Sequence, residues 1–317
     1  MQARTLGETG IALSRLGLGG YELGPESGTE PDVDRAVRVI QASMDAGINW
    51  LDSAEAYHDG GNELLIGSAL TRAGGGMLVA TKVGPGESLT SEGSGFRHDQ
   101  IHTACRSSLG RLGRDVIDVY FLHWPDESGV PLEETWGAMS ELVDQGLVRA
   151  IGMSNYQLDD IKACHGQRPV DVVQTGLSLI DHLEERDLIA GCGDLGIGVV
   201  IFEPLASGIL TGKSMQQVTE TWSAWVESAF WQRLLAPGKA ERSFAVADAM
   251  TPIADRLGAS VPQVAIAWVL AQAGVTAAIA GSRDGRHVDE NAGAVDLALG
   301  EALSELEALI PLGPAFG

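Results

Sequence analysis

Polar and ionisable residues stand directly after short apolar runs at several places in the chain. Asp52 follows INWL, Lys82 follows LVAT, and His123 follows IDVYFL. Later runs of the same kind end in Ser154 with Asn155, in Gln174, in Glu203, and in Ser282 with Arg283. A polar group at the end of a buried strand loses its hydration unless it interacts with another such group or with a ligand. Each residue alone is weak evidence, but together they indicate one site assembled from several strands.

The elements that must position these residues are eight apolar, β-branched runs with helical patterns between most neighbours. The runs are 16–20, 48–52, 78–82, 117–123, 148–153, 171–174, 198–202 and 276–281. Eight buried strands alternating with helices are typical of a parallel barrel, whose active site lies at the carboxyl ends of the strands. We therefore expect an α/β fold, a (β/α)8 TIM barrel, formed by residues 1–317 as a single domain.

The amino-terminal segment predicts an additional element. Residues 4–14, RTLGETGIALS, place glycine at turn positions and are expected to form a β-hairpin that closes the bottom of the barrel. The alternative fold is a doubly wound dinucleotide-binding sheet. Its GxGxxG fingerprint should follow an early strand, and the sequence has none there.

Composition and charge argue against several classes of partner. The chain has 43 acidic and 21 basic residues, and its formal charge of −22 repels nucleic acid and anionic membranes. No apolar run reaches the roughly 18 residues that span a membrane, and the first ten residues lack the apolar core of a signal peptide. Three widely spaced cysteines indicate reduced thiols and a cytoplasmic protein. An anionic ligand would need positive charge gathered locally at its site.

Several short motifs resemble those of the aldo-keto reductases in order and spacing, from about residue 5 to residue 310. They are DSAEAY (52–57), TK (81–82), LHWP (122–125), GMSN (152–155), VVQT (172–175), PLASGILTGK (204–213) and GSR…DEN (281–291). The resemblance places the family's catalytic tetrad on Asp52, Tyr57, Lys82 and His123. It implies an NADPH-dependent oxidoreductase that reduces aldehydes, ketones or sugar carbonyls, or runs in reverse as an alcohol or sugar dehydrogenase.

The chemistry of carbonyl reduction explains why these four residue types belong together. The carbonyl oxygen needs a proton, and Tyr57 is a plausible acid although an ordinary phenol has a pKa near 10. The ammonium of Lys82 is expected to lower that pKa by about 1–3. Asp52 would keep Lys82 charged and oriented. His123 can hydrogen-bond the carbonyl oxygen as charge develops on it.

The same resemblance implies residues for a nicotinamide cofactor. Ser154, Asn155 and Gln174 would bind the carboxamide and Phe202 would lie against the ring. The pyrophosphate would be wrapped by the segment 204–213, whose implied contacts are Pro204, Leu205, Ser207, Gly208 and Lys213. Glu203 stands where many family members have serine, so it must either point away from the phosphates or pair with a basic residue.

Cofactor choice depends on the segment 281–291. Gly281, Ser282 and Arg283 match family positions near the adenosine 2′-phosphate, and Glu290 with Asn291 match adenine contacts. Arg286 adds positive charge nearby, and His287 stands where family members often carry Gln or Arg. NADPH is therefore expected to be preferred over NADH.

Aromatic residues beside the strand ends are candidates for the substrate mouth. Tyr21, His58 and Trp124 are expected to frame it, with simple packing as the alternative for Tyr21 and Trp124. The segment 214–235 is rich in tryptophan and is interpreted as a lid, a subunit contact or an extra helix on the rim.

Two basic clusters are interpreted as ordinary helix surface. His98 and His102 have the i, i+4 spacing of metal ligands, but a tetrad mechanism needs no metal and no third ligand is apparent. We therefore predict no metal site there. Arg106, Arg111 and Arg114 are interpreted as a solvated helix end.

Two other functions stay open at this point. The fold can serve as a regulatory subunit that senses NADPH with slow turnover. A barrel enzyme acting on a sugar phosphate, such as an epimerase or aldolase, would instead fail to bind any dinucleotide. The physiological substrate and the oligomeric state are not predicted.

Overall fold

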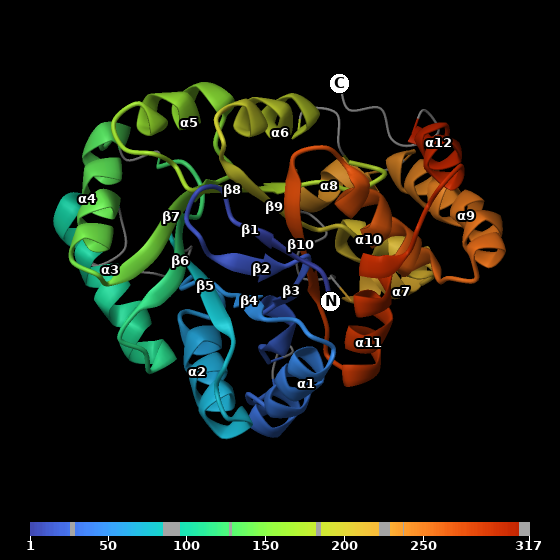
Figure 1. Cartoon of the computed structure of the whole chain (residues 1–317). Helices are drawn as coiled ribbons and strands as arrows, with labels where there is room; N and C mark the ends of the chain where they lie inside the picture. The colour runs from blue at the N-terminus through green and yellow to red at the C-terminus, as the bar shows by residue number, and fades with distance from the viewer. Residues whose placement is uncertain are drawn as a thin grey trace.

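The computed structural model shows a closed parallel barrel ringed by helices (Figure 1). It describes residues 1–25, 29–84, 96–126, 129–181, 185–221, 229–236 and 238–310. Within these residues the barrel strands are hydrogen-bonded in the order β10-β3-β4-β5-β6-β7-β8-β9. Apart from this closure between the first and last strands, neighbours in the barrel are neighbours in sequence. The predicted (β/α)8 barrel is confirmed.

The strands agree closely with the eight predicted runs. Their bounds are β3 Leu16–Gly19, β4 Trp50–Asp52, β5 Leu78–Val83, β6 Ile117–Leu122, β7 Val148–Ser154, β8 Val172–Gly176, β9 Gly198–Phe202 and β10 Val275–Gly281. The differences are confined to strand ends, where the side-chain pattern does not say which residue makes the last ladder hydrogen bond.

The helices follow the strands in the alternating order expected of this barrel. Those of the outer ring are α1 Val33–Asp45, α2 Gly61–Ala73, α3 His98–Leu112, α4 Leu132–Asp144, α5 Leu158–His165, α6 Glu185–Asp194, α10 Val261–Ala271 and α11 Gly285–Gly293. The insertion between β9 and β10 also holds α7 Met215–Thr221, α8 Ala229–Leu235 and α9 Lys239–Leu257, and α12 Ala302–Glu307 follows α11. No helix in the described ranges has the length and apolarity needed to cross a bilayer.

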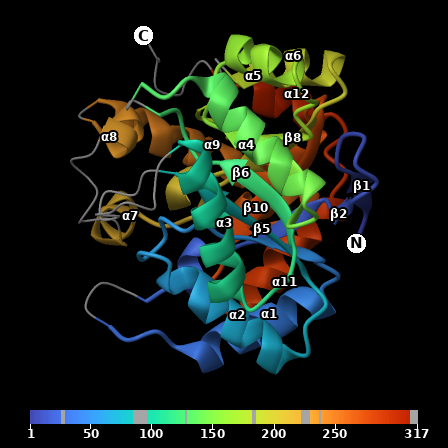
Figure 2. The same ribbon diagram turned by 90° about the vertical axis from the view of Figure 1, so that its left-hand side faces the viewer.

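A hairpin of β1 (Ala3–Thr5) and β2 (Ala12–Ser14) lies across one end of the barrel, as the glycine pattern predicted (Figure 1). Its buried residues Leu6, Ile11 and Leu13 join one apolar cluster with inward-facing strand residues such as Trp50 and Phe121. The hairpin thus fills the barrel interior from its amino-terminal end. Figure 2 shows α7 and α8 at the opposite end of the molecule.

A second, larger apolar cluster lies between the strands and the helices. It contains outward-facing strand residues such as Val79 and Ile151 together with helix residues such as Ile40 and Trp136. The three cysteines are free thiols within this layer. The barrel strands are therefore covered on both faces, which explains why their sequences are continuously apolar rather than alternating.

The buried Arg15 joins the hairpin to the closing strand. Its guanidinium donates to the carbonyl oxygens of Val275 (2.6 Å), Thr276 (2.7 Å) and Leu270. Burial and the nearby charge of Arg4 lower the pKa of Arg15 to about 10. The Val275 carbonyl also accepts from Arg4 at 2.9 Å, whereas for Thr276 and Leu270 the side-chain donor is Arg15.

We expect Arg15→Met to lower the free energy of unfolding by about 2–4 kcal/mol, because it leaves buried carbonyls without donors. Arg256→Met is the matched control, since its pair with Glu305 is exposed and should contribute less than about 1 kcal/mol. Urea unfolding followed by circular dichroism measures both. Equal losses in the two variants would contradict this role for Arg15.

Candidate active site

Several candidate site residues lie two positions after an inward-facing strand residue, and therefore on the same inner face of the barrel. Side chains alternate between the two faces of a strand, so residues two apart point the same way. Trp50, Ala80 and Phe121 belong to the interior cluster, and the residues two positions later are Asp52, Lys82 and His123. The same step leads to Ser154, Gln174 and Phe202, each two residues beyond a position on the inward face. Their shared location follows from strand geometry.

Three of the four predicted tetrad residues lie within direct reach of one another. Lys82 Nζ forms an ion pair with Asp52 and donates to the carbonyl oxygen of Ser53 at 2.7 Å. It also lies 3.4 Å from the hydroxyl of Tyr57. His123 completes the group through its ring, whose centroid is 5.7 Å from that of Tyr57 at an interplanar angle of 74°. Asp52, Lys82 and His123 are buried.

The pKa of Tyr57 differs from the sequence expectation. Burial raises the pKa of Tyr57 above its ordinary value, and the charge of Lys82 only partly opposes the rise. The expected net lowering was wrong because it omitted the cost of forming a phenolate inside the barrel. Burial also works against the charge of Lys82, but Asp52 and Tyr57 hold its pKa above the ordinary value. The structure therefore has a protonated phenol beside a charged ammonium.

His123 is a neutral imidazole at this mouth of the barrel. Burial, with a contribution from Lys82, places the pKa of His123 well below its ordinary value. Its Nδ1 atom is buried without a hydrogen-bond partner among the described residues. A neutral imidazole carries one N–H donor, which suits it to bind an oxygen atom.

The residues expected at the carboxamide are linked to the tetrad by hydrogen bonds. Gln174 Nε2 donates to Asp52 at 2.9 Å. Asn155 Nδ2 donates to the carbonyl oxygen of His123 at 2.9 Å and lies 3.1 Å from Ser154 Oγ. Ser154, Asn155 and Gln174 therefore lie against the predicted tetrad.

Strained backbone is concentrated at the same end of the barrel. In the described part of the chain, the non-glycine residues with positive φ are His58, Asp59, Asn155, Glu203, Ala206 and Ser207. All six follow the carboxyl ends of β4, β7 or β9. Such conformations cost about 1–3 kcal/mol each and cluster at functional sites. Their placement is independent support for this mouth as the active end.

Glu203 pairs with a basic residue from α8, one of the two arrangements expected from the sequence. Arg233 donates to Glu203 at 2.5 Å and to Asp181 at 2.5 Å, and Ser207 Oγ also donates to Glu203. Burial raises the pKa of Glu203, and Arg233 opposes the rise. The Glu203 carboxylate is thus neutralised directly before the loop 204–213.

Within the loop 204–213, Pro204 is buried, Leu205 and Ser207 are half-buried, and Lys213 is exposed. Gly208 has a φ of +97° and open space where a side chain would be.

The segment expected at the 2′-phosphate forms the start of α11. Ser282 Oγ and the backbone of Asp284 are hydrogen-bonded to each other, and Asp284 caps the helix. Arg286 is paired with Asp284 at 2.7 Å, which holds the pKa of Asp284 at about 2. Arg283 is exposed and carries charge near Glu22. A side chain at Gly281 would collide with the Glu22 carboxylate.

The remaining predicted cofactor residues lie around these two segments. Phe202 lies at the end of β9, where its ring edge would be 3.2 Å from a Cβ atom at Gly176. In α11, Asn291 is buried, Glu290 is half-buried and His287 is exposed. The backbone of Glu290 accepts a hydrogen bond from Gln263 at 3.0 Å.

The three predicted substrate residues surround the tetrad. Tyr21 packs edge-on against Tyr57, with ring centroids 5.2 Å apart, and stacks on His58 at 5.5 Å. Trp124 lies against His123 with a centroid distance of 3.9 Å. Of the tryptophan-rich segment, residues 222–228, which include Trp222 and Trp225, lie outside the described residues. The interpretation of that segment as a lid stays a hypothesis.

A buried charge network beneath the site was missed in the sequence. Arg111 bonds Glu63 at 2.6 Å and lies 3.7 Å from Glu55, while Thr81 donates to Glu63 at 2.6 Å. The interpretation of Arg111 as part of a solvated helix end was therefore wrong; Arg114 is also engaged, donating to the carbonyl oxygen of Met77 at 2.7 Å. The signal available was Glu55 inside the motif DSAEAY, two residues before Tyr57.

The interpretation of His98 and His102 as an exposed helix face holds for His98 but is wrong for His102. His102 is buried, with only 6% of its surface exposed, because α4 packs over it. Glu141 of α4 supplies the third group that the sequence did not reveal. Glu141 stands 39 and 43 positions after the two histidines, so no local pattern connects it to them.

The barrel thus gathers a phenol, an ammonium and an imidazole at the end where (β/α)8 barrels place their active sites. Residues 15–307 match the Aldo/keto reductase family. The chain therefore belongs to this family, whose members are oxidoreductases acting on carbonyl or alcohol groups.

Individual relatives agree with that assignment over nearly their whole length. The chain is 30% identical over 320 residues to the NADH-specific methylglyoxal reductase of Escherichia coli K12, covering 95% of this chain and 96% of that protein. It is 32% identical over 289 residues to the aldo-keto reductase YhdN of Bacillus subtilis 168, covering 89% and 85%. The solved glycerol dehydrogenase AKR11B4 of Gluconobacter oxydans has a TM-score of 0.82 and 27% identity, covering 99% of this chain and 97% of that one.

The buried Glu55 generates a prediction about stability and pH. Burial raises the pKa of Glu55 from 4.5 to about 7, with the Gly84 N–H and Arg111 opposing the rise. Between these pH values the folded chain keeps a proton that the unfolded chain has lost. The contribution of Glu55 to the free energy of unfolding therefore falls by about 3 kcal/mol as the pH rises through this window.

Denaturant unfolding at pH 5 and pH 8 tests this sign. Glu55→Gln should remove most of the decline, since glutamine keeps an acceptor for Gly84 and has no proton to lose. Glu305→Gln, at an exposed ion pair, should leave the decline as in the parent. A decline of the same size in Glu55→Gln would show that other groups cause it.

Proposed function

We propose that this protein is an NADPH-dependent aldo-keto reductase in which Tyr57 gives a proton to the carbonyl oxygen of a small or medium aldehyde, ketone or sugar. The observation that carries the proposal is the contact of Tyr57 with Lys82 at 3.4 Å, inside a family whose members act on carbonyl groups. The bound nicotinamide supplies the hydride. The reaction is reversible, so an alcohol or sugar dehydrogenase direction is part of the proposal.

The residues at this mouth fit a nicotinamide dinucleotide. The unpartnered Nδ1 atom of His123 indicates that the polar groups of the tetrad are not all satisfied by the protein. Gly208 and Gly212 have positive φ and no atom within reach of an added Cβ, so a ligand can approach their backbone closely. The pairing of Glu203 with Arg233 removes the repulsion that a free carboxylate would exert on a pyrophosphate.

The chain's own residues divide the proton-transfer work among them. His123 orients the carbonyl oxygen through its N–H, and Tyr57 holds the proton to be given. As that proton leaves, Lys82 stabilises the developing phenolate, because its ammonium already points at the hydroxyl oxygen. Asp52 keeps Lys82 charged, and Gln174 keeps Asp52 in place. Tyr21 and Trp124 supply an apolar wall beside the reacting atoms.

Tyr57→Phe should lower kcat by at least about a hundredfold, the scale expected for a positioned acid, while nicotinamide binding stays near the parent value. NADPH oxidation against a panel of aldehydes, ketones and sugars measures the rate, and quenching of tryptophan fluorescence measures binding. Tyr120→Phe is the matched control, since its buried hydroxyl has no hydrogen-bond partner in the described structure.

Three results would contradict parts of this proposal. Unchanged turnover in Tyr57→Phe would exclude it as the proton donor. Dinucleotide binding without turnover on any carbonyl would favour a sensing subunit. Failure to bind either dinucleotide would remove the nicotinamide role.

The preference for NADPH rests on Arg283 and on Ser282 before α11, where exposed positive charge and a helix amino terminus favour a phosphate. The relative from Escherichia coli is named as NADH-specific, so the preference must be tested on this chain's own residues. Arg283→Ala should raise the KM for NADPH about tenfold or more and change the KM for NADH little. Arg286→Ala is the control, because Asp284 already engages that side chain. Equal effects of Arg283→Ala on both cofactors would contradict the assignment.

A further inference from the structure

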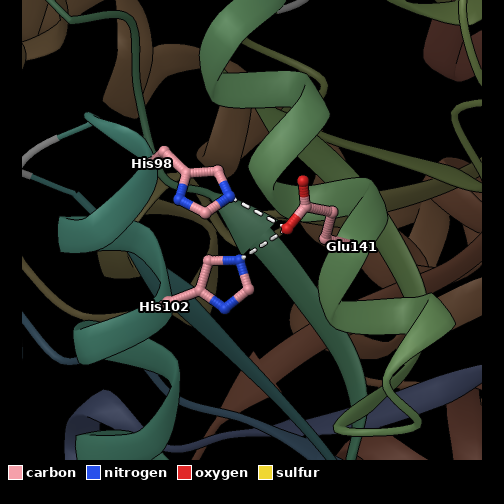
Figure 3. A group of neighbouring side chains, drawn as sticks. All are labelled: His98, His102 and Glu141. Carbon is pink, nitrogen blue, oxygen red and sulfur yellow. Dashed lines mark hydrogen bonds and ion pairs between the residues drawn. The ribbon is translucent and has the colours of Figure 1, made fainter.

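We propose that His98, His102 and Glu141 form a binding site for a divalent transition-metal ion, with Zn²⁺ as the reference ion, which links α3 to α4 on the flank of the barrel. His98 is the first residue of α3 and His102 lies one turn later on the same face. Glu141 reaches across from α4 to both imidazoles (Figure 3). These residues lie on outer helices and are not part of the tetrad mouth.

The distances between the three ligand atoms are close to those that a tetrahedral ion requires. His98 Nε2 lies 2.9 Å and His102 Nε2 lies 3.5 Å from the same oxygen of Glu141. All three ligand atoms lie within 4.8 Å of one another. Bonds of about 2.0–2.2 Å in a tetrahedral zinc site place neighbouring ligand atoms about 3.3 Å apart. Small side-chain movements therefore suffice to enclose an ion.

His102 shows that the cluster is more than one surface ion pair. Its ring is buried and directed at Glu141, yet its Nε2 atom has no hydrogen-bond partner among the described residues. A buried polar atom without a full hydrogen bond carries a free-energy cost, so His102 Nε2 is available to a ligand. The bond between His98 and Glu141 explains the position of those two side chains but leaves His102 with only a 3.5 Å contact to the same carboxylate.

Ligand type and exposure define which ion the site takes. Two imidazoles and one carboxylate suit Zn²⁺ and its neighbours in the first transition row, whereas Mg²⁺ and Ca²⁺ require oxygen ligands. The side chains of His98 and Glu141 are 50% and 52% exposed, so the ion enters from solvent and water completes its shell. Arg106 lies close enough to His102 to oppose a cation, but the protein's charge of −22 favours one.

Calorimetric titration of the untagged, chelator-treated protein with Zn²⁺ tests the site. We expect one ion per chain, no binding heat with Mg²⁺, and a rise in Tm of about 4 °C when Zn²⁺ is present at a hundredfold excess over Kd. His98→Gln and Glu141→Gln should each weaken Zn²⁺ binding about tenfold or more and remove most of the Tm rise. Both side chains are half exposed, so neither substitution endangers folding.

A third substitution and a control complete the experiment. His102→Gln should weaken Zn²⁺ binding at least as strongly. His165→Gln in α5 is the control, because that imidazole accepts a hydrogen bond from the Val170 amide and belongs to no three-ligand group among the described residues. The proposal is overturned if the parent shows no saturable Zn²⁺ binding, or if His98→Gln and Glu141→Gln bind as the parent does.

Discussion

The buried ion pair between Asp52 and Lys82 is the interaction on which the rest of the candidate site depends. Their side chains are 6% and 1% exposed, so both ions have lost nearly all contact with water. Desolvation of this kind costs several kcal/mol per ion and is offset only where further hydrogen bonds satisfy the pair. Ser53 and Gln174 supply those bonds. Removal of either ion would leave an uncompensated charge inside the barrel, which costs about 3–5 kcal/mol.

The fold was readable from the sequence because each strand is a run whose both faces are buried. The runs 78–82 and 148–153 correspond closely to β5 and β7 because most of their residues are apolar and buried. Asp52, Lys82 and His123 were readable for a related reason: an ionisable residue directly after such a run is unusual unless it has a partner. Tyr57 follows no such run and was identified from the motif DSAEAY that resembles the family. Periodicity and strand ends are local properties, and a single sequence records them directly.

Interactions between distant elements were not readable. The partner of Glu203 is Arg233, on a helix of the insertion between β9 and β10, and Glu141 lies 39 residues beyond His102. No spacing rule relates such positions, because their proximity depends on how helices pack around the barrel. The direction of the pKa of Tyr57 was missed for a similar reason, since it depends on burial by residues from several strands. The sequence identifies the chemical groups, whereas the folded environment determines their protonation.

The barrel holds some of the candidate site residues at strand ends and others in the connecting segments. The tetrad side chains Asp52, Lys82 and His123 are fixed by strand alternation, so a one-residue insertion within a strand would turn them away from the interior. Tyr21, His58 and Trp124 belong instead to connecting segments beyond the strands. Loops tolerate insertion and exchange far better than strands do. Replacement of the segments that carry Tyr21 and Trp124 can therefore change the surroundings of the site while Asp52 and Lys82 stay in place, whereas the segment with His58 also carries Tyr57 and is less free to change.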